Sequence, residues 1–296
     1  MKRLVIIGAG FSGIECGRQA ANACETVHGT TRSEDKFSKL TAAGIKPVLF
    51  DGLSQSKNDA SLERVLAEAT DLLVSIAPGE DGDVVLNRFA AILKQSKKLR
   101  WICYLSTVGV YGDHGGSWVN ESSECRPKSK RSILRVAAEQ GWQTFAEQVG
   151  VPLAIFRLSG IYGPGRNAFM NIEKGRSRRL VKPGQVFNRI HRDDIAGAFV
   201  RCLSSRPDGI FNITDDQPAP PQDVVTLAHE LYGSTPPAEI DFQTADLSPM
   251  ARSFYGENKR VSNAKSKAVL GMEYKWPNYQ TALAKMWKED CWRATD

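Results

Sequence analysis

Short β-rich runs alternate with helical stretches through the first half of the chain. Runs of β-branched and other apolar residues predict six strands, at Leu4–Ile7, Thr26–Thr30, Pro47–Phe50, Asp71–Ile76, Trp101–Leu105 and Leu153–Arg157. Between two of these runs, helical spacing places Val85, Phe89, Ile92 and Leu93 on one face. Parallel neighbours in a sheet need helical crossovers of this kind. The alternation therefore predicts an α/β fold, a doubly wound parallel sheet covered by helices.

The pattern changes after Gly163-Pro164-Gly165. Residues 166–188 are basic and irregular, a helix is predicted over Ile190–Leu203, and a strand over Gly209–Ile213. A proline-rich stretch then encloses a helix predicted over Val224–Tyr232. We expect a first domain formed by residues 1–165 with 189–214 returning to it, and a smaller second region formed by residues 166–188 and 215–296.

Composition places the chain among ordinary globular proteins, with 296 residues, 42% hydrophobic and 24% charged. It contains no run of eighteen apolar residues, so no membrane span is expected. Lys2-Arg3 before an apolar run imitates a signal peptide, but glycines interrupt that run at once. The six cysteines lack the spacing of a metal site or a disulfide framework. We therefore expect a cytoplasmic protein with reduced thiols.

The net charge is +6, and basic residues are concentrated in two segments, Arg126–Arg135 and Lys174–Lys182. Either these segments are solvated surface, or they attract an anionic ligand such as a nucleotide or phosphate. No helix-turn-helix, zinc or RNA-binding aromatic signature accompanies the charge, so a nucleic-acid partner is not expected. No Ser-His-Asp set, metal-ligand cluster or P-loop is evident, which leaves hydrolase, metalloenzyme and kinase chemistry without support.

A G-x-G-x-x-G motif directly follows the first predicted strand and opens a helix. Gly8 permits the tight turn, Gly10 lets the backbone approach a pyrophosphate, and Gly13 lets helix and strand pack closely. Phe11 and Ser12 stand at the start of the helix, whose free N–H groups and partial positive charge favour phosphate. The order of strand, glycines, helix and second strand predicts a dinucleotide-binding Rossmann domain.

The end of the second strand indicates which dinucleotide binds. NAD selection usually places a carboxylate there, whereas this chain has Thr31, Arg32 and Ser33 before the first carboxylate at Glu34. A guanidinium and hydroxyls suit a 2′-phosphate, so we expect NADP in preference to NAD. The alternative interpretation of Arg32 is that it is simply an exposed arginine at the start of a helix. Asp51, ending the third strand, is a candidate for binding the adenine amino group, or it caps a turn.

Later motifs resemble the extended short-chain dehydrogenase/reductase family, which contains nucleotide-sugar epimerases and dehydratases. The segments that carry this resemblance are Ser106-Thr107-Val108-Gly109-Val110-Tyr111-Gly112, Arg157-Leu158-Ser159-Gly160-Ile161-Tyr162-Gly163-Pro164-Gly165, Asn188-Arg189-Ile190-His191-Arg192-Asp193-Asp194-Ile195-Ala196 and Gly209-Ile210-Phe211-Asn212-Ile213. It covers essentially the entire chain. For the cofactor it implies further contacts with Ala77, Pro78, Ser159 and Ile161.

One departure from the family stands out. The family's catalytic pair is Tyr-x-x-x-Lys, and alignment on Glu139 and Tyr111 puts Arg131 at the tyrosine position and Arg135 at the lysine position. In the family that lysine lowers the pKa of the tyrosine for proton exchange with a carbonyl or alcohol. Arginine stays protonated and only donates, so the usual proton relay is predicted to be absent. The chain is therefore similar to an atypical member of the family.

Four residues remain candidates for catalysis. Thr107 matches the family's hydrogen-bond donor to the substrate oxygen, Arg135 is a candidate to bond the ribose hydroxyls, and Arg131 a candidate to stabilise an oxyanion. Each also has a purely structural interpretation: Thr107 as a threonine at the end of a strand, and the two arginines as part of a solvated helix face. Proton transfer then needs another group, and Tyr111 is one candidate, beside the two alternatives Tyr162 and His191. A structural histidine before a helix start explains His191 equally simply.

Two functions stay open. The first is an NAD(P)-dependent oxidoreductase, epimerase or dehydratase for a small, oxygenated and anionic substrate such as a nucleotide sugar, whose phosphates Arg176, Arg178 or Arg179 would contact. The second is a binding protein that senses NADP(H) without turnover, which the missing catalytic pair favours. The expected partner is a small molecule bound by the second region, and a homodimer is the default for soluble oligomers.

Overall fold

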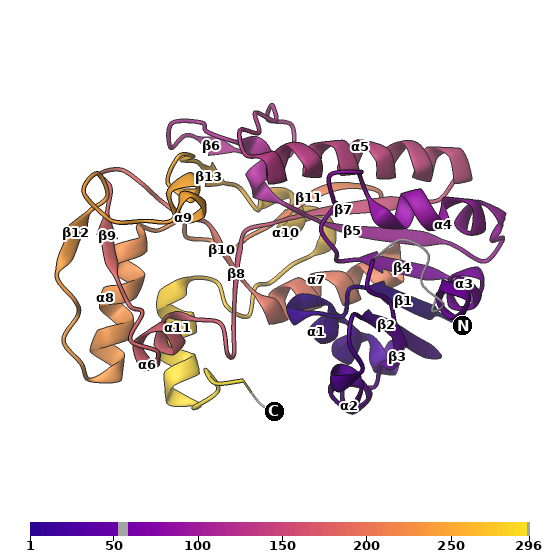
Figure 1. The fold of residues 1–296 in the computed structure, drawn as a ribbon, viewed down its shortest axis with the longest axis horizontal. Helices are drawn as coiled ribbons and strands as arrows, with labels where there is room; N and C mark the ends of the chain where they lie inside the picture. The colour runs from indigo at the N-terminus through magenta and orange to yellow at the C-terminus, as the bar shows by residue number, and fades with distance from the viewer. Residues whose placement is uncertain (53–58, 295–296) are drawn as a thin grey trace. The chain divides into compact units, whose positions relative to one another are not determined.

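The apolar runs of the chain form one seven-stranded sheet (Figure 1). The computed structural model describes residues 1–52 and 59–294. The sheet has the order β11-β7-β5-β4-β1-β2-β3. Its strands are β1 (Arg3–Ile7), β2 (Thr26–Thr31), β3 (Lys46–Leu49), β4 (Asp71–Val74), β5 (Trp101–Thr107), β7 (Leu153–Leu158) and β11 (Gly209–Ile213). The predicted fold class is confirmed, and the strand order reverses between β1 and β4, where such sheets bind ligands.

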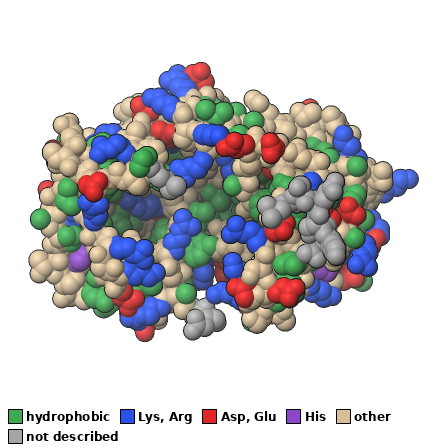
Figure 2. Space-filling model, in the orientation of Figure 1, with side chains coloured by type: hydrophobic (Ala, Val, Ile, Leu, Met, Phe, Trp, Pro, Cys, Tyr) green, Lys and Arg blue, Asp and Glu red, His purple; other side chains and the backbone are tan. Residues whose placement is uncertain are grey.

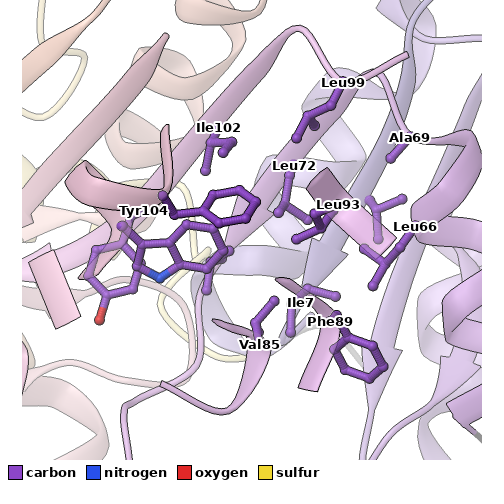
Figure 3. Packing of buried hydrophobic residues seen from close by; sticks show 14 of the residues in the cluster. Ile7, Leu66, Ala69, Leu72, Val85, Phe89, Leu93, Leu99, Ile102 and Tyr104 are labelled. Atoms are coloured by element: carbon purple, nitrogen blue, oxygen red, sulfur yellow. The ribbon is translucent and has the colours of Figure 1, made fainter. Parts of the chain in front are cut away.

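Helices cover the sheet because each presents one apolar stripe to it. They are α1 (Phe11–Ala20), α2 (Phe37–Ala42), α3 (Asp59–Glu68), α4 (Val84–Gln95), α5 (Lys130–Val149) and α7 (Arg192–Ser205). Asp83 caps α4 by accepting hydrogen bonds from the N–H groups of Val85 and Leu86. Figure 3 shows Phe89 and Leu93 of α4 packed among strand side chains such as Leu72.

The chain divides into two compact units. The first comprises Met1–Thr107, Lys130–Arg157 and Ile195–Phe211, and the second comprises Val108–Ser129, Leu158–Asp194 and Asn212–Asp296. Compared with the expected first domain of residues 1–165 and 189–214, the first unit lacks residues 108–129, 158–165, 189–194 and 212–214, which belong to the second unit. The chain leaves the sheet after β5 through a 3-10 turn (Val108–Tyr111) and again after β7, and β6 then pairs with the distant strand β13.

The second unit is built from short strands and helices. Its strands form three two-stranded sheets, from β6 (Trp118–Val119) with β13 (Arg260–Val261), β8 (Gly160–Tyr162) with β10 (Arg189–His191), and β9 (Arg179–Val181) with β12 (Glu239–Asp241). Its helices are α6 (Ala168–Glu173), α8 (Pro221–Tyr232), α9 (Pro249–Phe254), α10 (Ala264–Leu270) and α11 (Tyr279–Lys288). Phe169, Trp276 and Trp292 anchor its own hydrophobic core.

Some predicted boundaries change. Ile190, expected to begin a helix, lies in β10, and α7 begins at Arg192. The cause is pairing with β8, where Ile190 lies opposite Ile161. The helix predicted from Val224 begins earlier, at Pro221, because proline suits the first turn of a helix. None of the described helices is both long and apolar enough to cross a membrane.

Candidate dinucleotide site and its surroundings

The turn after β1 is tied to the neighbouring strand β2. Gly8 adopts a φ of +94°, a conformation that disfavours any side chain. Its N–H donates to the hydroxyl of Thr30 at 2.7 Å, and the N–H of Ala9 donates to the Thr30 carbonyl at 2.9 Å. These bonds fix the position of the turn, and with it the point where α1 begins.

The three glycines of the motif differ in what a side chain would meet. A Cβ atom on Gly8 would lie 2.6 Å from the Ile76 side chain, and one on Gly13 would lie 2.4 Å from the Gly8 carbonyl oxygen. A Cβ atom on Gly10 meets no atom within 4 Å. Gly8 and Gly13 are therefore required for packing, while Gly10 leaves open space at the helix start.

The N-terminus of α1 suits an anion. Gly10 is its N-cap and supplies no capping side chain, and the first turn carries no acidic residue. The first N–H groups of a helix have no acceptor within it and carry partial positive charge. Glu15, farther along, is paired with Arg18 at 2.5 Å. Open space beside these N–H groups fits the pyrophosphate of a dinucleotide, as the motif predicts.

The polar residues expected at the end of β2 differ in burial and in hydrogen bonding. The Thr31 hydroxyl is buried and donates to the carbonyl of Ser33 at 3.3 Å, so it is engaged in the turn. Arg32 is exposed, and among the described residues it forms no hydrogen bond or ion pair. Its guanidinium therefore remains available to an anion outside the chain.

Further predicted residues follow the carboxyl ends of neighbouring strands. Asp51 follows β3, Ala77 and Pro78 follow β4, and Thr107 ends β5. Because β3, β2, β1, β4 and β5 pair in parallel in this order, these positions lie along the same sheet edge as the glycine turn. Asp51 is exposed and Thr107 is half-buried. The structure thus brings these candidates to one edge of the first unit.

The two arginines of α5 have different surroundings. Arg131 is exposed, whereas Arg135 is half-buried. Arg135 Nη1 donates to the Tyr104 hydroxyl at 2.8 Å and to the Leu105 carbonyl at 2.9 Å. Burial raises the pKa of Tyr104 to about 12, although the Arg135 charge opposes this. Part of the Arg135 guanidinium is therefore already committed to β5.

A buried ionic network below Arg135 was not predicted from the sequence. Glu139 of α5 accepts a hydrogen bond from the Ser106 hydroxyl at 2.5 Å, and Arg157 of β7 lies 2.7 Å from it. Both charged side chains are about 5% exposed. The signal was present, since Arg157 lies in an apolar strand and therefore needs a buried partner. The network fixes the register of α5 on β5 and β7.

The remaining predicted residues lie in the second unit. Tyr111 is fully buried and its hydroxyl donates to Asn212 Oδ1 at 2.7 Å, so it is a packed group in this structure. Its catalytic role stays a prediction. Ser159 is buried and its hydroxyl has no partner among the described residues, while Ile161 is half-buried in β8. Their proposed contacts with the cofactor also stay predictions.

The alternative proton-transfer groups of the second unit are buried together. His191 stacks on Trp276 with ring centroids 4.2 Å apart, and Tyr162 meets its edge at 5.2 Å. His191 Nδ1 accepts from the N–H of Asp193 at 3.2 Å, at the start of α7. Burial, followed by nearby cations, lowers the pKa of His191 to about 3, and burial raises the pKa of Tyr162. His191 is thus a neutral helix-start histidine at physiological pH.

The basic segment 174–182 is partly neutralised. Arg179 pairs with Glu239 at 2.5 Å, and Arg178 donates to the Asp246 carbonyl. Arg176 is exposed and has no partner among the described residues. Figure 2 shows Lys and Arg side chains interspersed with acidic ones over the visible face. Arg176 is therefore the arginine of this segment that is left for an anion.

Comparison with known proteins agrees with this geometry. A sequence model described as the NAD dependent epimerase/dehydratase family matches residues 4–214. A structure of a functionally unknown conserved protein from Silicibacter pomeroyi DSS is 40% identical, covers 98% of this chain and 99% of its own, and superposes with a TM-score of 0.87. Protein YeeZ of Escherichia coli is 23% identical over 298 residues, which cover 94% of this chain and 97% of YeeZ.

A more distant likeness concerns the fold. UDP-glucuronic acid 4-epimerase from Bacillus cereus, in complex with NAD, is 16% identical, covers 97% of this chain and 98% of its own, and superposes with a TM-score of 0.75. The family match confirms the resemblance inferred from the motifs, which lie between residues 8 and 213.

Proposed function

This chain belongs to the NAD dependent epimerase/dehydratase family, and on that premise we propose that its first unit binds a pyridine dinucleotide, with the pyrophosphate at the start of α1. Membership bears out the expectation of an oxidoreductase- or epimerase-type enzyme at the level of the family. The observation that carries the binding proposal is the contrast among the motif glycines. Two of them are packed against the chain, while Gly10 leaves its space open beside the helix N–H groups.

The test is a matched pair of alanine substitutions. Gly10 has a φ of −90°, so Gly10→Ala introduces no backbone strain, and its methyl group would occupy the space left for phosphate. Gly197 of α7 is the control, because its Cβ also meets no atom within 4 Å. Calorimetric titration with NADH and NADPH should show binding to the parent chain and to Gly197→Ala. Gly10→Ala should bind at least about tenfold more weakly, which corresponds to one lost charge-assisted hydrogen bond.

Equal thermal unfolding of the two variants would show that Gly10→Ala is folded. The proposal fails if the parent chain gives no heat with either dinucleotide, or if Gly10→Ala binds as tightly as Gly197→Ala.

We further propose that the preferred dinucleotide is NADP. Support comes from Arg32, whose exposed guanidinium has no partner among the described residues, and from the first carboxylate appearing only at Glu34. Arg32→Ala should then weaken NADPH by roughly tenfold to a hundredfold and leave NADH unchanged. Tighter binding of NADH than NADPH by the parent chain would refute this preference while leaving dinucleotide binding intact.

For the substrate we propose a small, oxygenated anion of the nucleotide-sugar kind. The B. cereus epimerase that shares the fold is named for a nucleotide sugar. Arg176, which is exposed and has no partner among the described residues, offers a phosphate contact in the second unit. Oxidation of NADPH or interconversion of sugars, followed with a panel of nucleotide sugars, aldehydes and ketones, tests this. Sustained turnover that disappears in Thr107→Ala would support the proposal that the chain is an enzyme.

A second function, sensing NADP(H) without turnover, has one specific observation in its favour. Helix α5 contains no tyrosine, and the Arg135 guanidinium is bonded to Tyr104 and Leu105. Tight dinucleotide binding with no turnover on any substrate of the panel would favour the sensor.

A further inference from the structure

An open cavity of about 330 Å³ lies in the first unit, away from the glycine turn. Its walls come from the first halves of β1 and β2 and from α3. In β2, Gly29 faces Ile45 and Leu40, so the alternating residues Thr26 and His28 face the opposite side of the sheet. The glycine turn and Arg32 instead follow the carboxyl ends of the same two strands. The cavity is therefore separate from the proposed dinucleotide site.

Four side chains of the cavity carry polar groups that no described residue binds. The hydroxyls of Thr26 and Ser61 and the ring nitrogens of His28 have no hydrogen-bond partner among the described residues. Arg64 uses only its Nε, which donates to the Ala60 carbonyl, and its two Nη groups remain available. These four side chains thus line one space with polar groups that no described residue binds.

The charge of the cavity is positive. Glu68 is its acidic residue, and that carboxylate is held by Arg3 and by Lys98, each at 2.6 Å. Arg64 has no such counter-ion among residues 1–52 and 59–294. Burial and the nearby charge of Lys46 lower the pKa of His28, so its imidazole is neutral at pH 7 and offers one donor and one acceptor. These groups favour an anion, with Arg64 able to grip it by two parallel hydrogen bonds.

The remaining lining is apolar. Val5 of β1 and Val65 of α3 contribute side chains to the cavity. Small-molecule sites commonly combine such an apolar surface with a few convergent polar groups, in volumes from about 300 Å³. We propose that this cavity is a second ligand site, which binds a small organic anion whose charged end contacts Arg64 and whose short apolar end contacts Val65, the partly exposed valine of the lining.

The test uses butyrate as the probe, with butyramide as a neutral molecule of the same shape and inorganic phosphate as an anion without an apolar end. The chain has four histidines, so the His28 ring signals can be assigned by His28→Asn and followed by proton–carbon NMR. Butyrate should shift the His28 signals saturably, with a Kd on the order of 1 mM. Butyramide and phosphate should each bind at least about fivefold more weakly.

Arg64→Ala should weaken butyrate at least about tenfold, which is the loss of one charge-assisted pair. Arg100→Ala is the matched control, because Arg100 is another exposed arginine of the first unit that does not line the cavity, and it should change nothing. Saturating NADH should leave the butyrate Kd unchanged, which separates this site from the dinucleotide site. The proposal is overturned by an absence of saturation, by equal binding of butyramide or phosphate, or by equal effects of the two arginine substitutions.

Discussion

Removal of Glu139 is expected to destabilise the first unit strongly. Its carboxylate lies 2.7 Å from Arg157, and both side chains are about 5% exposed. Glu139→Leu would leave the guanidinium charged and buried, with the Ser106 hydroxyl deprived of its acceptor. Breaking a buried pair in this way costs about 3–5 kcal/mol of unfolding free energy. Replacement of both charges, in Glu139→Leu with Arg157→Met, should cost less than the sum of the single changes by at least about 2 kcal/mol.

The assay is urea unfolding followed by circular dichroism, with all variants at one pH. A matched control is the Lys98–Glu68 pair, which is equally short at 2.6 Å but about half exposed on both sides. Lys98→Ala should cost less than about 1 kcal/mol, because water screens an exposed pair. If Glu139→Leu cost no more than Lys98→Ala, or if the two changes at Glu139 and Arg157 were additive, burial would not be what gives this pair its importance.

Three further outcomes can be measured. Burial raises the pKa of Asp215 to about 8, above its value in the unfolded chain. The contribution of this carboxyl group to stability should therefore be complete below about pH 4 and lost as the pH rises to about 8. Urea unfolding of Asp215→Asn across that range should lack this loss. Tyr111→Phe should lower the unfolding free energy by about 1 kcal/mol, because its hydroxyl bonds Asn212. Tyr162→Phe should not lower it, since that buried hydroxyl has no protein partner among the described residues, and a loss as large as that of Tyr111→Phe would contradict this account. Gly13→Ala should lower the melting temperature well below that of Gly10→Ala, because only the first methyl would meet the Gly8 carbonyl; equal melting would contradict the packing role of Gly13.

The sheet edge that carries the glycine turn was predictable because its signals are local. A glycine spacing after an apolar run specifies a turn, and parallel strands bring their carboxyl ends to one edge whatever the loops contain. The sequence also placed Arg32 directly after β2, where the structure leaves it exposed.

The rest depended on contacts between residues far apart in the chain. The burial of Tyr111 against Asn212 and the ion pair of Glu139 with Arg157 leave no spacing pattern in either partner. The second unit takes residues 108–129 from the middle of the expected domain because β6 pairs with β13, more than a hundred residues later. Short strands of two or three residues carry too little alternation to be recognised before their partners are known.

The first unit is assembled from three separated segments of the chain, and this affects how the unit folds during synthesis. Trp101 of β5 donates its indole N–H to the Pro207 carbonyl at 3.0 Å, and the fully buried Asp71 pairs with Arg206 at 2.9 Å. During synthesis, β4 and β5 must therefore wait for Arg206 and Pro207, and β7 must wait for its neighbour β11, before their surroundings are complete. A fragment cut after residue 165 would leave a carboxylate without its counter-ion and a sheet edge bare, so such a piece should associate with itself or be degraded.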